Sequence, residues 1–261
     1  MTARRLAWLS GLGALFLAAP APAAERDLAF SWTTHVLERG RDDLEVWLTP
    51  RIARLDPGYS RVDTRFVWTH GVVANLESQV SLDLGLENTE RDHAVDPRVT
   101  SLWRWAPWRA TGPVGLGVVG RASLGLDVVE LEARLIVDKQ LGDLLLAANV
   151  AAEQSFPWGG RAGVTTRVEA TLGLAYTVAP FARVGLEARA KSSFARGDYQ
   201  GTALYVGPGL AFRFRPLWLS IAATIQAAAD KAPADRDASE PMTLRDDERF
   251  VLRFTFGFPT D

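Results

Sequence analysis

The strongest constraint on the fold is an alternation of apolar and polar residues that extends over residues 43–258. Between Leu76 and Leu86, leucine and valine occupy one parity and mostly polar residues occupy the other. A period of two is typical of β-strands whose two faces meet different environments. We expect twelve such strands, at residues 43–54, 60–70, 76–87, 97–106, 113–126, 128–138, 143–154, 165–178, 182–194, 201–214, 217–228 and 249–258.

Alternation alone does not say which face points inward, because a soluble barrel buries its leucines and a membrane barrel exposes them to lipid. Three features favour the membrane. The connections 71–75, 107–112, 139–142, 179–181 and 215–216 are short, whereas 88–96, 154–164, 195–200 and 230–248 are longer, with a tight exception at 126–128. The last strand carries alternating phenylalanines. Aromatic residues, which favour the headgroup level, gather at the expected periplasmic strand ends: Trp68, Trp103, Trp105, Trp108, Tyr176, Phe181, Phe212, Phe214, Phe256 and Phe258, with Trp218 facing inward.

The first residues have the pattern of a secretory signal peptide. Arg4 and Arg5 precede an apolar run over residues 6–19, and residues 21–23 supply an A-x-A cleavage pattern. We therefore expect a signal peptide at 1–24, a periplasmic N-terminal segment at 25–42 and a single all-β antiparallel transmembrane barrel of about twelve strands at 43–261.

Several short stretches resemble one uncharacterised family of Gram-negative outer-membrane β-barrel proteins, porin-like and built on a domain of unknown function. The stretches 33–40 (TTHVLERG) and 45–51 (EVWLTPR) are similar to the opening of that family, and 173–176, 185–189 and 206–210 are similar to its later strands. The resemblance implies a barrel fold and an outer-membrane location, and it brings no catalytic residues.

The charged residues on the inward parity make up the expected lining of the lumen. Their mixed signs indicate either a selectivity-setting channel wall or an internal network in which the charges neutralise one another. The turn at 179–181 would place Glu169 opposite Lys191, with Arg189 diagonal to it. Small inward residues at Gly115, Gly117, Ala147, Ala151, Gly173 and Gly185 favour a water-filled lumen. The expected lining is Arg61, Arg65, Asp83, Arg104, Arg121, Glu130, Glu132, Arg134, Glu153, Arg167, Glu169, Arg183, Glu187, Arg189, Arg213 and Arg253.

No motif indicates catalysis, a metal site or a cofactor. The match Gly115-x-Gly117-x-x-Gly120 resembles a dinucleotide-binding fingerprint, but it lacks the preceding strand and the following helix that such a site needs. The three histidines are scattered and none lies beside a serine on a strand face. The carboxylates of loop 230–248 are mixed with basic residues, which favours a solvated loop over a cation site.

The sequence therefore predicts an outer-membrane protein of a Gram-negative bacterium that is not an enzyme. The leading function is a channel for small polar solutes, and the alternative is a non-conducting structural or surface-interaction barrel closed by an Arg/Glu network. The expected partners are membrane lipid and lipopolysaccharide, the barrel-assembly machinery and, for a channel, a small solute. The formal net charge of −2 gives no reason to expect nucleic acid.

Overall fold

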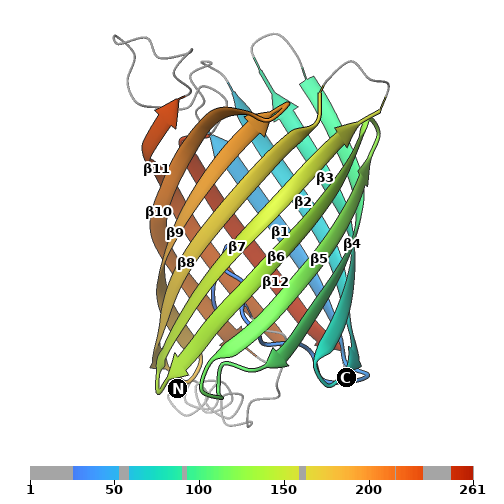
Figure 1. The fold of residues 1–261 in the computed structure, drawn as a ribbon. Coiled ribbons are helices and arrows are strands. Elements are labelled where there is room, and N and C mark those ends of the chain that lie inside the picture. Colours follow the sequence, from blue (N-terminus) through green and yellow to red (C-terminus); the bar gives the residue numbers. More distant parts are fainter. Residues whose placement is uncertain are drawn as a thin grey trace, which may run out of the picture.

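In the computed structural model the chain forms a closed barrel of twelve antiparallel strands, as the sequence predicted (Figure 1). Each strand pairs with its sequence neighbours, and β1 pairs with β12 to close the sheet. The strands are β1 (Asp42–Ile52), β2 (Ser60–Val73), β3 (Leu76–Asn88), β4 (His93–Trp108), β5 (Gly115–Gly125), β6 (Val128–Leu141), β7 (Leu144–Pro157), β8 (Thr165–Ala179), β9 (Ala182–Ala195), β10 (Asp198–Phe214), β11 (Leu217–Lys231) and β12 (Phe250–Thr260).

The structure describes residues 26–52, 59–89, 93–158, 163–214, 216–231 and 248–260. The predicted signal peptide and all but the ends of the predicted loop 230–248 lie outside these ranges. Within them, no helix is long and apolar enough to cross a bilayer.

The two ends of the barrel differ in their connections. At the end where β1 begins and β12 ends, which we call the turn end, the strands are joined through 74–75, 109–114, 142–143, 180–181 and 215–216. The opposite end, the loop end, carries the connections 53–59, 89–92, 158–164 and 232–249, together with tight turns at 126–127 and 196–197. The predicted alternation of short and long connections therefore holds with two exceptions.

Three predicted loops at the loop end were too long. The loop predicted at 154–164 is shortened, because β7 continues to Pro157. The loop predicted at 195–200 is wrong, because β9 and β10 continue to a two-residue hairpin at Arg196 and Gly197. These residues have φ angles of 53° and 90°, the positive values that a type I′ hairpin turn requires. The loop predicted at 88–96 is shortened, because β4 begins at His93 and Asp96 pairs with Gly85 of β3.

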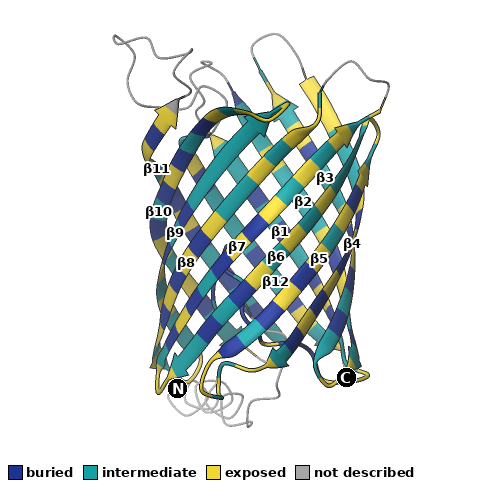
Figure 2. Ribbon diagram, viewed as in Figure 1, coloured by how far each residue is buried: buried dark blue, intermediate teal, exposed yellow. Residues whose placement is uncertain are grey.

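The two faces of the sheet have the orientation of a membrane barrel. On β3, Leu82 is 46% exposed on the outside while its neighbour Ser81 is 6% exposed and faces the lumen. The same alternation of exposed and less exposed residues runs along the strands in Figure 2. Near the turn end the outer surface carries a girdle of exposed aromatic residues, and Trp218 faces inward as predicted. The girdle contains Trp68, Trp103, Trp105, Trp108, Tyr176, Phe181, Phe214 and Phe258.

Residues 26–37, which we call the plug, lie inside the barrel at the turn end (Figure 1). Leu28, Phe30, Val36 and Leu37 are each at most 3% exposed. The plug then leaves the lumen and joins β1, where Gly40 donates a backbone hydrogen bond of 2.7 Å to Gly71 at the end of β2. The sequence had predicted an N-terminal segment before the barrel, and its position within the lumen was not part of that prediction.

Candidate functional site

Hydrogen bonds from the plug backbone to polar side chains of the barrel wall hold the plug, together with apolar packing of Leu28 and Phe30. Glu187 on β9, which is 1% exposed, accepts bonds from the N–H groups of Ala29, Phe30 and Ser31 at 2.8, 2.9 and 2.7 Å. Asn149 on β7 accepts a bond from the Trp32 N–H at 2.6 Å and donates one to the Trp32 carbonyl at 2.9 Å. The wall thus satisfies backbone groups that the plug, having no regular secondary structure, does not pair itself.

The remainder of the plug is anchored in the same way on β6, β3 and β4. Asp138 accepts the Thr34 N–H at 2.6 Å, and Glu77 accepts the Leu37 N–H at 2.9 Å. Arg104 donates to the Thr33 carbonyl at 3.2 Å and forms an ion pair of 2.6 Å with Glu77.

Ion pairs fix the start of the plug. Arg26 lies 2.9 Å from Glu45 of β1, and Asp27 pairs with Arg213 at 2.8 Å and also with Arg183. The plug is therefore fixed in the lumen by ion pairs at its start and by backbone hydrogen bonds along its length.

Glycines in the wall make the space that the plug occupies. A Cβ atom added to Gly173 would lie 2.5 Å from Cδ1 of Leu28, and one added to Gly115 would lie 2.6 Å from Oγ1 of Thr34. A Cβ atom added to Gly185 would lie 3.5 Å from Cδ2 of Leu28, at van der Waals contact. The interpretation of these small inward residues as a sign of a water-filled lumen is therefore wrong at the turn end, since the plug fills the space that they leave.

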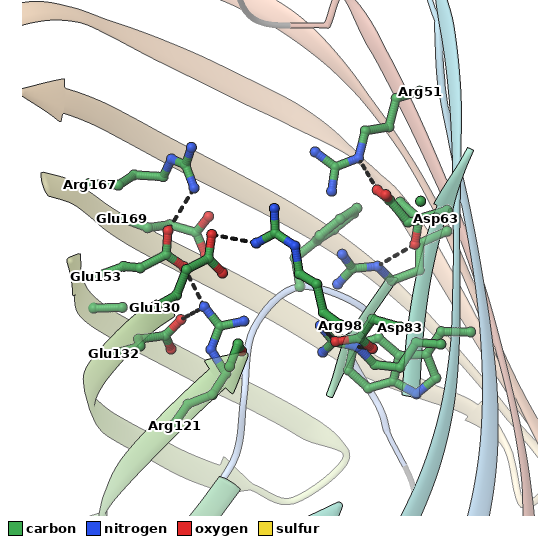
Figure 3. A pocket seen from close by; sticks show the side chains of 18 of the residues that line it. Arg51, Asp63, Asp83, Arg98, Arg121, Glu130, Glu132, Glu153, Arg167 and Glu169 are labelled. Carbon is green, nitrogen blue, oxygen red and sulfur yellow. Dashed lines mark hydrogen bonds and ion pairs between the residues drawn. The ribbon is translucent and has the colours of Figure 1, made fainter. Parts of the chain in front are cut away.

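On the loop-end side of the plug the lumen contains a cavity of about 390 Å³ (Figure 3). Phe30 and Trp32 of the plug contribute to its lining, and the rest comes from the wall. The cavity is densely charged. Its cations are Arg51, Arg61, Arg65, Arg98, Arg121, Arg134, Arg167, Arg189, Lys191 and Arg253, and its carboxylates are Asp63, Asp83, Asp96, Glu130, Glu132, Glu153, Glu169 and Glu248.

On the side formed by β1 to β4 these groups form a continuous chain of ion pairs. Arg51 pairs with Asp63 at 2.6 Å, and Asp63 also accepts Arg61 at 2.7 Å. Arg61 in turn lies 3.0 Å from Asp96, which holds Arg98 at 2.9 Å. Alternating signs along the chain neutralise each charge locally, as expected for groups that are only about one-quarter exposed.

A second chain runs across β5 to β9. Arg121 pairs with Glu132 at 2.9 Å, and Glu132 holds Arg134 at 3.0 Å. Arg134 reaches Glu169 at 3.5 Å, and Glu169 accepts Arg189 at 2.8 Å. The side chains in this chain are 9–16% exposed, so they are less accessible to water than those of the first chain.

An ion pair between Arg98 and Glu130 joins the two sides, and Figure 3 shows it crossing from one group of charges to the other. Arg167 pairs with Glu153 at 2.7 Å, and its side chain is 55% exposed. The cavity therefore has one edge that reaches solvent.

The structure places the residues predicted to line the lumen in two groups. Arg104, Arg183, Glu187 and Arg213 hold the plug or pair with it. The predicted register of Glu169 opposite Lys191 is confirmed. The others line the cavity: Arg61, Arg65, Asp83, Arg121, Glu130, Glu132, Arg134, Glu153, Arg167, Glu169, Arg189 and Arg253.

The sequence analysis missed several members of this site. Asp63 and Arg98 share the parity of residues on their own strands that were predicted to face inward, so a strict use of the alternation would have included them. Arg51 lies on the first strand, for which no lining residue was predicted. Asp96 was missed because it was assigned to a loop. Glu248, which pairs with Arg51 at 3.5 Å, precedes β12 and has no strand parity to reveal it.

The motifs considered for other chemistry do not form a site. Gly115, Gly117 and Gly120 all lie on the continuous strand β5. His35 belongs to the plug, whereas His70 contacts Asp42 and His93 contacts Asn88. Among the residues that the structure describes, no group of three or more His, Asp or Glu side chains is arranged to hold a metal ion.

The architecture is similar to that of known outer-membrane barrels, although the sequence is not. No protein-family model matches the sequence, and neither does any curated protein. Among solved structures, KdgM porin superposes with a TM-score of 0.54 at 8% identity, covering 84% of this chain and 99% of the porin. The chain has the fold of a porin-like outer-membrane barrel. KdgM porin in complex with disordered oligogalacturonate gives 0.54 at 7% identity, covering 83% and 99%, and LpxR from Salmonella typhimurium gives 0.50 at 6%, also covering 83% and 99%.

Proposed function

We propose that the protein is an outer-membrane channel for small polar solutes, and that the plug closes it in the conformation described. The observation that carries this proposal is the position of residues 26–37, which occupy the turn end of the lumen while a charged cavity remains on the other side. The mixed charges of the cavity suit hydrated polar solutes and exclude apolar ones.

The number of strands supports a lumen that is wider than its wall side chains can fill. Side chains fill the interior of a barrel of about 8 strands, whereas barrels of about 16–18 strands leave an aqueous channel. With 12 strands this barrel lies between the two. The strand ladder closes through β1 and β12 without the plug, so withdrawal of the plug leaves an intact wall.

The nature of the anchors also supports a removable plug. Its hydrogen-bond partners Glu187, Asp138 and Glu77 are carboxylates, which water solvates well once it enters the lumen. Leu28 and Phe30 also pack in apolar clusters with wall residues, and withdrawal of the plug has to break these contacts as well.

One observation favours a second candidate, a non-conducting structural or surface-interaction barrel. The Arg98–Glu130 pair reaches over β5 and adds a carboxylate of the second side to the first chain of ion pairs. In that case the charge network itself closes the barrel, and removing the plug opens nothing.

Conductance in planar bilayers distinguishes the two candidates. We expect the mature protein to show little conductance and a variant that lacks residues 26–37 to show stable open channels. Heat-modifiable migration in gels checks that the variant is still a folded barrel. A folded deletion variant that conducts no better than the intact protein contradicts the channel and leaves the second candidate.

The proposal includes the location and partners expected for such a barrel. The turn end faces the periplasm, the girdle contacts lipid of the periplasmic leaflet, and the outer wall towards the loop end contacts lipopolysaccharide. The assembly machinery of a Gram-negative outer membrane inserts the chain. N-terminal sequencing should find the mature protein beginning at Ala24 or Glu25 in the outer-membrane fraction. An intact Met1, or recovery from the soluble periplasm, would contradict this assignment.

A further inference from the structure

The charges that line the cavity do not balance. Ten cationic side chains face eight carboxylates of the lining and Glu87, which pairs with Arg61 at 3.2 Å, and this leaves a formal difference of +1. A charge surplus in a partly enclosed space is costly unless a counter-charge is present. The position of the surplus therefore indicates where an anion would bind.

The surplus is concentrated at Arg253 on β12. Its Nη1 donates to the Ala29 carbonyl at 2.9 Å, and its Nε donates to Oγ1 of Thr49 at 3.3 Å. Both acceptors are neutral, and no described carboxylate forms an ion pair with this guanidinium. Its Nη2 group also makes no hydrogen bond with a residue that the structure describes, so one edge of the fork remains available.

Aromatic rings hold the arginines of this region in place without using their N–H groups. The guanidinium carbons of Arg253 and Arg189 both lie 4.3 Å from the ring centroid of Phe30, a residue of the plug. Arg253 also lies 5.3 Å from the Trp47 ring, and Arg65 lies 5.0 Å from it. Stacking on a ring face orients a guanidinium while its in-plane donors stay free for a ligand.

Further donors in the same cavity lack partners. Nη1 of Arg134 and Nε of Arg189 are buried and have no hydrogen-bond partner among the described residues. Both side chains are only 9% exposed and both line the cavity. Buried donors without partners are rare in folded proteins, and a bound ligand is one of the ways in which they are satisfied.

We propose that the cavity binds a small solute carrying a carboxylate or phosphate group, with Arg253 and Arg189 as the main donors above Phe30. The planar fork of arginine matches both anions, because it offers two parallel N–H groups to two oxygens. This assignment names the solute class of the channel proposed above and rests on the plug being in place, since Phe30 belongs to the plug. Binding itself requires no conduction.

Calorimetric titration of the full mature chain in detergent micelles tests the assignment. Sodium phosphate is the probe in one arm and sodium acetate in the other, at constant ionic strength set with sodium chloride. We expect saturable binding in at least one arm, and the arms show which oxyanion is preferred. Arg253→Gln should weaken that binding about tenfold or more, because it removes a charge-assisted contact.

Arg167→Gln is the matched control. It removes the same charge from the same cavity, but Arg167 is exposed and already paired with Glu153, so affinity should change little. The absence of saturable binding in both arms overturns the assignment, as does equal weakening by the two variants. If Arg253→Gln does not fold, Arg253→Lys replaces it, and unchanged affinity in that variant also overturns the assignment. Failure of the plug-deleted barrel to conduct bears on the channel and leaves this measurement unaffected.

Discussion

Glu187 is the single side chain on which the position of the plug depends most, and Glu187→Gln changes its chemistry at nearly constant shape. The carboxylate accepts three backbone N–H groups, one through Oε1 and two through Oε2. An amide keeps one oxygen, which can retain the bonds to Phe30 and Ser31 but without the charge. Its NH2 group then faces the Ala29 N–H, and two donors oppose each other.

The expected loss of docking free energy follows from these three contacts. Losing the charge weakens each of two hydrogen bonds by about 0.5–1.5 kcal/mol, and the opposed donors cost about 1–3 kcal/mol, so docking of the plug should weaken by about 2–6 kcal/mol. At the lower bound the undocked state becomes roughly 30-fold more populated.

Hydrogen exchange measured by mass spectrometry reports this population directly, because amides in the plug exchange when it undocks. Peptides covering residues 26–37 should exchange at least roughly 30-fold faster in Glu187→Gln, while peptides from β3 and β6 stay protected. Glu153→Gln is the control, since Glu153 pairs with Arg121 and Arg167 of the wall rather than with the plug. Unchanged exchange of the plug in Glu187→Gln would refute the view that the Glu187 carboxylate anchors it.

Three further substitutions test other parts of the structure. Gly173→Ala places a methyl group against the plug and should destabilise its docking by about 1–3 kcal/mol, measured by hydrogen exchange, whereas Gly120→Ala meets open space and should not. Leu82→Arg, at the middle of β3 on the lipid face, should cost about 2–4 kcal/mol in equilibrium unfolding, and Leu86→Arg, nearer the loop end, should cost less. Glu132→Gln removes the shared partner of two arginines and should lower stability by about 1–3 kcal/mol; a thermal midpoint equal to that of the parent protein would show that the second charge chain contributes nothing.

The barrel was predictable from the sequence because lipid and lumen impose opposite demands on neighbouring residues. That contrast repeats on every strand, so errors in single positions did not change the count of strands. Strand ends were less predictable, because they depend on contacts between strands. Asp96, for example, stays in β4 through its pairing with β3 and its ion pairs with Arg61 and Arg98.

The plug was not predictable in the same way. Its residues contact many strands around the barrel at irregular intervals, so no periodic pattern records its environment. The available signal was the set of inward glycines near the turn end, at Gly115, Gly117, Gly173 and Gly185. Small wall residues indicate space, but the sequence does not say whether water or another part of the chain fills it.

The charges of the lumen were largely predictable from parity, but their pairing was not. Partners on adjacent strands can follow from register, as the ion pair of Arg65 on β2 with the opposite Asp83 on β3 shows. Ion pairs between strands that are not adjacent depend on how far each side chain extends. The pair between Arg98 on β4 and Glu130 on β6 skips a strand, and no local pattern specifies it.

The anchors of the plug have a consequence for how the protein assembles. Glu77 lies on β3, Asp138 on β6, Glu187 on β9 and Arg253 on β12, which is every third strand around the circumference. An open, partly curled sheet cannot present all four to the same short segment. Docking of the plug is therefore complete only when β1 has met β12, and the free energy of docking favours the closed circle over a flattened or dilated one. The segment works as an internal gauge of the barrel's circumference.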